Sequence, residues 1–113
     1  MTRGKFVLVP FPFDDLSSSK VRPALCLTEP IGPNRHVIVA FLTSRIDSEL
    51  STTDIVLEPS APGFAETGLR VASTLRLHRV VTLSTSLILR ELGVLSSSLQ
   101  KEVNDGLRNL FAL

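Results

Sequence analysis

The sequence predicts a single, mainly β domain: a small barrel completed by helices at its C-terminal end. Short apolar runs separated by loops rich in proline and glycine fill the first two thirds of the chain, as in small all-β folds. Apolar residues recur at helical spacing only in the tail. With 113 residues, of which 43% are apolar, the chain is long enough for one domain with its own core, spanning residues 1–113.

The strands are expected where apolar and β-branched residues dominate. Four strand candidates cover residues 5–9, 24–28, 35–43 and 54–57. Since the run at 35–43 is the most apolar, we place it at the centre of the sheet. Residues 69–83 predict either two short strands or one bent strand. The intervening segments are expected to be loops: 14–20, 29–34, 44–53 and 58–68.

The tail changes to a helical period. Residues 85–92 predict a short helix that stops at Gly93. Ser97 and Gln100 have the spacing of a capping box, in which a serine and a glutamine satisfy each other's backbone donors. A second, amphipathic helix over 97–112 is predicted by Leu99, Val103, Leu107, Leu110 and Phe111.

Composition narrows the function classes. A net charge of +1 argues against a broad nucleic-acid-coating surface, so any contact with nucleic acid is expected to be local. The one cysteine, Cys26, lies in an apolar run and predicts a buried thiol in a cytosolic protein. His36 and His78 have no neighbouring Cys or His partner, and we expect neither a metal nor a cofactor. No apolar stretch approaches the ~20 residues that span a bilayer.

Arg22 is the first candidate for a functional residue. Pro23 disfavours the helical conformation for the preceding residue, so Arg22 is extended at the entrance to a buried strand. Its stem can pack while its guanidinium, with five donors in a fixed fork, faces the loop and suits a phosphate. The alternative is an ion pair across the loop with Asp14 or Asp15.

Two further polar segments could join this site. Thr43 and Ser44 emerge where the central apolar run ends, although threonine also ends strands and serine also starts turns. In STLRLHR at 73–79, alternation places Thr74, Arg76 and His78 on one face, which could receive a phosphate backbone or remain a solvated strand face. His78 is a conceivable general acid or base, or an incidental strand residue.

The segment PFPF at 10–13 adds two aromatic side chains near this region. Each proline lacks a backbone donor, so the segment leaves the sheet or follows its edge. Phe11 and Phe13 could stack on nucleic-acid bases, or could belong to the core or to a dimer contact.

Taken in order, these segments resemble the MazF/PemK family of toxins from bacterial toxin–antitoxin systems, and most closely its PemK-like branch. The resemblance covers nearly the whole chain. It runs through RGKFVLVPFPFDDLSSSKVRPALCL, VIVAFLTSRI, STLRLHRVVTL and GVLSSSLQKEVNDGLRNLFAL. No one of these stretches is decisive, but their ordered set is fairly specific.

The resemblance implies a fold, an activity and partners. The fold would be a small SH3-like β-barrel of the MazF/PemK/CcdB type with C-terminal helices, forming a homodimer in the bacterial cytoplasm. The activity would be sequence-specific, metal-independent cleavage of single-stranded RNA. The 2′-hydroxyl would attack the adjacent phosphorus, leaving a 2′,3′-cyclic phosphate and a 5′-hydroxyl. A cognate antitoxin protein would bind and inhibit the toxin.

The resemblance also assigns roles to residues of this chain. Arg22 and Thr43 align with the family's catalytic arginine and threonine, and Arg76 with a late-strand arginine that contacts substrate. The remaining expected RNA contacts are Ser19, Lys20, Ser44, Thr74 and Phe13. The loop before Arg22 reads SSSK where relatives are often glycine-rich, so the cleaved RNA sequence is not carried over.

Two other functions fit the same fold. One is a dimeric module that binds RNA or a peptide without cleaving it, and the other is a toxin directed at DNA gyrase, since a fold does not fix a function. The presence of both Arg22 and Thr43 favours the ribonuclease over these two alternatives.

Overall fold

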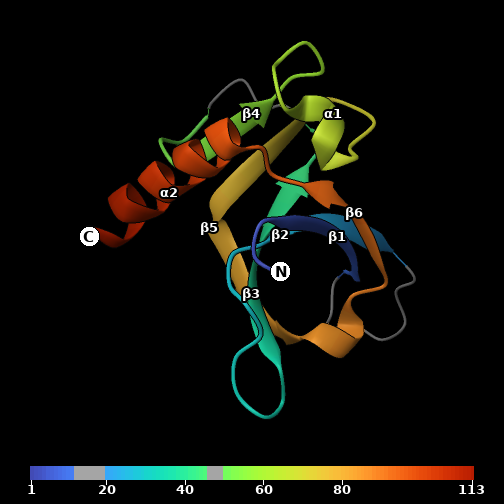
Figure 1. The fold of residues 1–113 in the computed structure, drawn as a ribbon. Coiled ribbons are helices and arrows are strands. Elements are labelled where there is room, and N and C mark those ends of the chain that lie inside the picture. Colours follow the sequence, from blue (N-terminus) through green and yellow to red (C-terminus); the bar gives the residue numbers. More distant parts are fainter. Residues whose placement is uncertain (12–19, 46–49) are drawn as a thin grey trace.

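The computed structural model describes residues 1–11, 20–45 and 50–113 (Figure 1). One antiparallel six-stranded sheet dominates it, in the order β4-β5-β3-β2-β1-β6. The strands are β1 (Lys5–Pro10), β2 (Val21–Cys26), β3 (His36–Thr43), β4 (Asp54–Leu57), β5 (Ser73–Ser84) and β6 (Arg90–Val94). The helices are α1 (Phe64–Thr67), the 3-10 turn η1 (Thr85–Leu87) and α2 (Ser97–Phe111). None of the described helices is long and apolar enough to cross a membrane.

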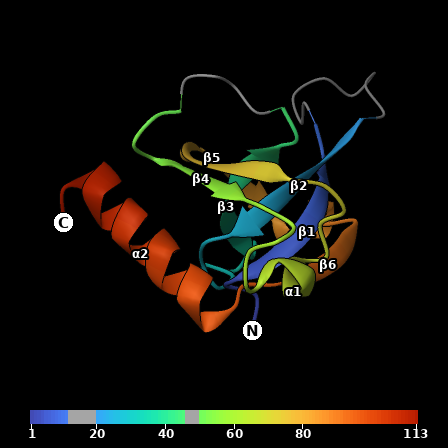
Figure 2. The same cartoon turned by 90° about the horizontal axis from the view of Figure 1, so that it is seen from above.

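The sheet is strongly curled (Figures 1 and 2). It buries apolar side chains on both faces. Because side chains alternate along a strand, Phe6 and Leu25 point to the face covered by α1 and α2, whereas Val7 and Cys26 point to the other. β3 lies inside the sheet between β5 and β2, as its apolar sequence predicts. The prediction of a mainly β fold with a C-terminal helix is confirmed.

β5 is a single bent strand. Its pairing with β3 runs from His36↔Ser84 to Ala40↔Val80 and resumes at Leu42↔Leu75, so β5 carries extra residues between the two stretches. The bend lets the first half of β5 pair with β4 as well, with Asp54 opposite Arg76. Of the two alternatives for residues 69–83, the bent strand is correct, although it begins at Ser73.

The helix predicted over 85–92 is wrong. Only the short turn η1 forms there, and β6 then pairs with β1, which would otherwise be an open sheet edge. The backbone N–H of Leu89 already donates to the carbonyl of Leu8. Ladder hydrogen bonds to β1 outweigh the weak local helical preference of an eight-residue segment. The expected loop at 58–68 instead contains α1.

α2 forms where the apolar spacing predicts it, with Leu99 and Val103 buried against the sheet. Its N-cap is Ser96, whose hydroxyl accepts from the N–H of Leu99, so the predicted capping box beginning at Ser97 is wrong by one residue. Gly106 weakens the helix locally. A Cβ there would lie 2.5 Å from a methyl carbon of Leu77, so its absence lets the helix approach β5.

Cys26 should be chemically inert in the folded protein. It is buried at the end of β2, and burial raises the pKa of its thiol to about 11. The reactive thiolate is therefore scarce at pH 8, and iodoacetamide should label the native chain at least about a hundredfold more slowly than the denatured chain. Mass spectrometry of timed samples measures both rates, and equal rates would mean that β2 opens readily.

Candidate active site

The candidate site lies where β2 and β3 separate. Their ladder runs from Cys26↔Val39 to Ala24↔Phe41 and stops there. The same register would next place Pro23 opposite Leu42 and Arg22 opposite Thr43. Pro23 has no N–H to donate, and on its other side β2 remains paired with β1. The sheet therefore opens at this point, with Arg22 on one side of the opening and Thr43 on the other.

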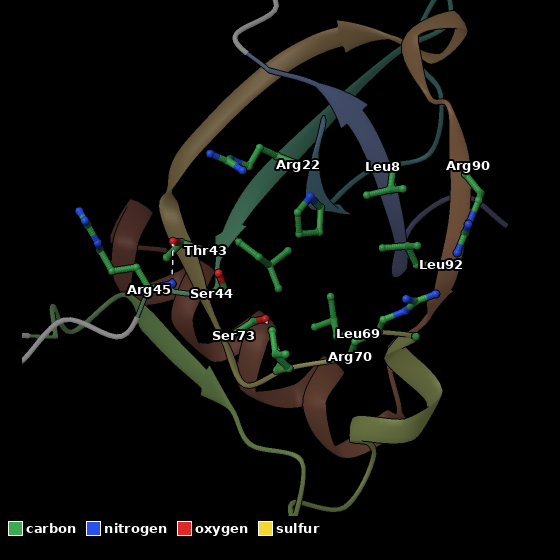
Figure 3. Close-up of a pocket in the computed structure, with 14 residues that line it drawn as sticks. Leu8, Arg22, Thr43, Ser44, Arg45, Leu69, Arg70, Ser73, Arg90 and Leu92 are labelled. Carbon is green, nitrogen blue, oxygen red and sulfur yellow. Dashed lines mark hydrogen bonds between the residues drawn. The ribbon is translucent and has the colours of Figure 1, made fainter. Parts of the chain in front are cut away.

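A cavity of about 750 Å³ lies in this opening (Figure 3). Arg22, Thr43, Ser44 and Arg45 line it on the β2–β3 side, and Arg70 and Arg90 line it elsewhere. Its remaining lining is Leu8, Pro23, Leu42, Gly68, Leu69, Val71, Ser73 and Leu92. Its volume falls within the range of about 300–1,000 Å³ that small-molecule sites occupy.

A second cavity, of about 240 Å³, adjoins the first. The two share four lining residues: Arg22, Leu42, Thr43 and Arg45. Phe11, Phe41, Arg76 and Arg79 complete the smaller one. We call the two cavities together the groove. Arg22 and Thr43 thus stand at its midpoint, where the cavities meet.

The groove is strongly cationic although the chain is nearly neutral. Six arginines line it: Arg22, Arg45, Arg70, Arg76, Arg79 and Arg90. Among the described residues, no acidic side chain lines either cavity. A concave surface with one sign of charge concentrates ligands of the opposite sign. The cationic side chains that could make the predicted local contact with nucleic acid are therefore gathered in this groove.

Arg22 is held over an aromatic pair. Its guanidinium carbon lies 5.9 Å from the centroid of the Phe11 ring, within cation–π range. The Phe11 and Phe41 rings pack edge to face with centroids 5.3 Å apart. Arg22 lies within β2, which begins at Val21, three residues before the predicted start of the strand at residue 24. Its alternative partners, Asp14 and Asp15, lie outside the described residues.

Thr43 presents a hydroxyl with an available proton. Its Oγ1 accepts a hydrogen bond of 3.1 Å from the N–H of Arg45, which fixes the side chain and leaves its own O–H to donate. Ser44, the next residue, is exposed on the rim of the larger cavity. Thr43 and Ser44 thus have the positions that the sequence suggested for them.

Arg76 is fixed by a buried carboxylate on the neighbouring strand. Its Nε lies 3.4 Å from Oδ1 of Asp54, whose side chain is only 1% exposed. Oδ2 of Asp54 accepts from the N–H of Ser51 at 3.0 Å. His78 lies on the same strand face, with Nδ1 3.2 Å from Oγ1 of Thr53, but it lines neither cavity.

Replacing Asp54 with alanine should lower the free energy of unfolding by about 2 kcal/mol, because it leaves the N–H of Ser51 without its acceptor and removes the buried carboxylate that forms an ion pair with Arg76. Asp105→Ala is the control. Its carboxylate pairs with Arg108 at 3.6 Å but is more than half exposed, so the loss should be below about 0.5 kcal/mol. Urea denaturation of the variants measures both, and equal losses would contradict the prediction.

Some of the predicted RNA-contacting residues do not line the groove, and others lie outside the described residues. Thr74 is wrong as a surface contact, because it is 2% exposed and packs inside the sheet. Its neighbour Ser73 lines the larger cavity in its place. Lys20 is exposed but lines neither cavity. Ser19 and Phe13 lie outside the described residues.

Four arginines of the groove are not among the site residues predicted from the sequence: Arg45, Arg70, Arg79 and Arg90. Arg90 was assigned to a helix that does not form, and the chain reversal around α1 brings Arg70 to the groove. Arg79 ends the segment STLRLHR, which the sequence already marked as a candidate phosphate contact, so its position could have indicated a role in the groove. Strand alternation sets it apart from Arg76, but the bend in β5 brings both to the smaller cavity.

Comparison with solved structures shows the same fold in toxins of one class. Over 98% of both chains, the protein is similar to the Mycobacterium tuberculosis toxin MazF-mt6, with a TM-score of 0.69 and 21% identity. It is similar to an endoribonuclease in complex with its cognate antitoxin from a mycobacterial species, with a TM-score of 0.70 and 16% identity over 100% of this chain and 96% of that one. Among curated proteins, no significant match was found.

The family assignment comes from the sequence itself. Residues 2–111 match the family model described as PemK-like, MazF-like toxin of type II toxin-antitoxin system. The match includes both strands that carry Arg22 and Thr43 as well as the C-terminal helix. The chain therefore belongs to the PemK-like and MazF-like toxins of type II toxin–antitoxin systems.

Proposed function

We propose that this toxin is a metal-independent endoribonuclease that cuts single-stranded RNA at specific short sequences. The observation that carries the proposal is the position of Arg22 and Thr43 at the midpoint of a groove lined by six arginines. The groove suits a chain of phosphates, and its midpoint offers two kinds of hydrogen-bond donor to one of them.

The proposed reaction uses the nucleophile that RNA carries. The 2′-oxygen forms a bond to the adjacent phosphorus and the P–O5′ bond breaks, which yields a 2′,3′-cyclic phosphate and a 5′-hydroxyl. Over the reaction the 2′-hydroxyl loses a proton and the departing 5′-oxygen gains one. Negative charge grows on the non-bridging oxygens in the transition state, and fixed donors aimed at them lower its free energy.

Arg22 and Thr43 supply those donors. The guanidinium of Arg22 keeps its charge at any physiological pH and can hold two phosphate oxygens at once. The hydroxyl of Thr43, oriented by its bond to the Arg45 N–H, donates to the same phosphate. An unstacked single strand is the substrate class, because only splayed bases can enter the cavities on either side of the phosphate.

We further propose that the toxin acts in the bacterial cytoplasm as a homodimer and that an antitoxin blocks its groove. One structural neighbour is an endoribonuclease bound to its cognate antitoxin, which supports such a partner. Exposed apolar side chains are available for a second copy: Val80, Leu87, Leu89 and Val94. Light scattering of the purified chain measures the assembly.

The deciding experiment incubates the purified chain with a long single-stranded RNA in EDTA and maps the ends produced. Discrete cuts with cyclic-phosphate 3′ ends are expected from the native chain and from Arg108→Ala, which changes an exposed arginine on α2. They are not expected from Arg22→Ala. No cleavage by folded native protein would refute the proposal and favour a binding module or a gyrase-directed toxin.

A further inference from the structure

Two arginines of the larger cavity stand apart from Arg22 and Thr43. Arg70 follows α1, and Arg90 is the first residue of β6. Both line the larger cavity, and in Figure 3 both side chains lie on the side away from Thr43 and Arg45. Both side chains are exposed, and neither makes an ion pair with a described residue. The proposed reaction does not use this pair.

The nearest carboxylate in sequence is already occupied. Glu91 follows Arg90 on β6, and its side chain pairs with Nζ of Lys5 at 3.3 Å. Because neighbouring residues of a strand point to opposite faces, Arg90 remains on the cavity side. Arg76 and Arg108 have carboxylate partners of their own. The donors of Arg70 and Arg90 are thus available to an external anion.

The surface between the two cationic ends is apolar. It is lined by Leu8, Pro23, Leu42, Leu69, Val71 and Leu92. The hydroxyls of Ser44 and Ser73 lie beside them, and that of Thr43 lies at the end that carries Arg22. A cation, an apolar floor and a second cation form the complement of a phosphate, a base and a second phosphate. Charge complementarity therefore favours a single nucleic-acid strand as the occupant.

We propose that Arg70 and Arg90 bind the phosphate adjacent to the one that is cleaved, with the intervening base on the apolar floor. The inference rests on the proposed ribonuclease function and adds a subsite to it. The subsite binds substrate and transition state alike, so it lowers KM without changing kcat. It also sets a minimum substrate: a strand that extends one phosphate beyond the cut on that side.

The test uses short RNA substrates that carry a neutral methylphosphonate in place of one phosphate flanking the cut, on either side in turn. Arg70→Gln, Arg90→Gln and the double variant are compared with Arg108→Gln. For the unmodified substrate, the double variant should raise KM roughly tenfold or more, with kcat within about twofold. The slope of log KM against log salt should fall by about 0.7 for the lost phosphate contact.

The neutral linkage makes the test specific. At one flanking position the neutral linkage should raise KM for the native enzyme. It should leave KM of the double variant unchanged, because that variant already lacks the contact with this phosphate. Unchanged KM in the double variant, a loss confined to kcat, or equal sensitivity of both proteins to the linkage would each overturn the inference. If the double variant does not fold, as judged by its melting curve, the single variants decide in the same way.

The inference can fail separately from the function. If the native chain cleaves RNA but Arg70 and Arg90 prove dispensable, only the subsite is overturned. If the native chain cleaves nothing, the proposed function fails. Binding of an uncleavable single-stranded DNA then decides the subsite: weaker binding by the double variant supports it, and equal binding overturns it. A double variant that loses only antitoxin binding also overturns it, because the occupant would be a protein.

Discussion

Arg22→Ala should reduce the rate of RNA cleavage at saturating substrate by at least about a hundredfold, because removal of one fixed donor to a developing oxyanion costs 10²–10³ in rate. The fold should survive, since Arg22 is exposed and its pairing with Val9 uses only backbone groups. Single-turnover cleavage with excess enzyme measures the rate, and the melting temperature reports the fold.

Arg22→Lys separates charge from geometry. Lysine keeps the positive charge but not the fork that contacts two phosphate oxygens, so its activity should remain well below that of the native chain. Arg79→Ala is a matched control, because it removes another arginine of the same small cavity, one that does not line the larger cavity. It should mainly raise KM. Equal loss of kcat in Arg22→Ala and Arg79→Ala would contradict a special role for Arg22.

Gly68→Ala should destabilise the protein by about 3 kcal/mol or more. Gly68 ends α1 with φ of 74°, in the left-handed region, and a Cβ would lie 2.0 Å from the carbonyl oxygen of Leu92. That atom belongs to the backbone of β6 and cannot move aside without breaking the strand from α1. Urea denaturation measures the loss.

Gly32→Ala is the control for backbone strain. Gly32 has the same φ of 74°, but no heavy atom lies within 4 Å of its would-be Cβ. It should therefore lose only the strain of a left-handed alanine, roughly 1–2 kcal/mol. The difference between the two variants isolates the clash with Leu92. No difference would mean that α1 and β6 are not packed as described.

Contact between α1 and β6 also shapes the groove. Gly68 lies on the wall of the larger cavity, and Gly93 brings β6 against the backbone of Glu66 and Thr67. This contact holds Arg70, which follows α1, on the same cavity as Arg90 at the start of β6. Displacing α1 should therefore affect substrate binding as well as stability.

The sequence by itself determined the strand core, the terminal helix and the family. Apolar runs at 35–43 and 54–57 and the helical spacing from Leu99 onward are local signals that the final fold reinforces. Arg22 and Thr43 were also identifiable. Pro23 keeps Arg22 extended at the entrance to a buried strand, and Thr43 ends the central apolar run. Resemblance to a known family joined the two.

Only the tertiary structure decided β6 and the extent of the groove. A segment such as 85–92 has too few residues to fix its own conformation, and the open edge of β1 selects a strand. The same long-range pairing brings Arg90 to the cavity that Arg70, twenty residues earlier in the chain, also lines. Strand alternation likewise predicts the face on which Thr74 lies, but not its burial. Thr74 is buried because β5 is paired there with both Thr43 and Val56. Periodicity gives the face of a strand, whereas what covers that face depends on contacts between distant segments.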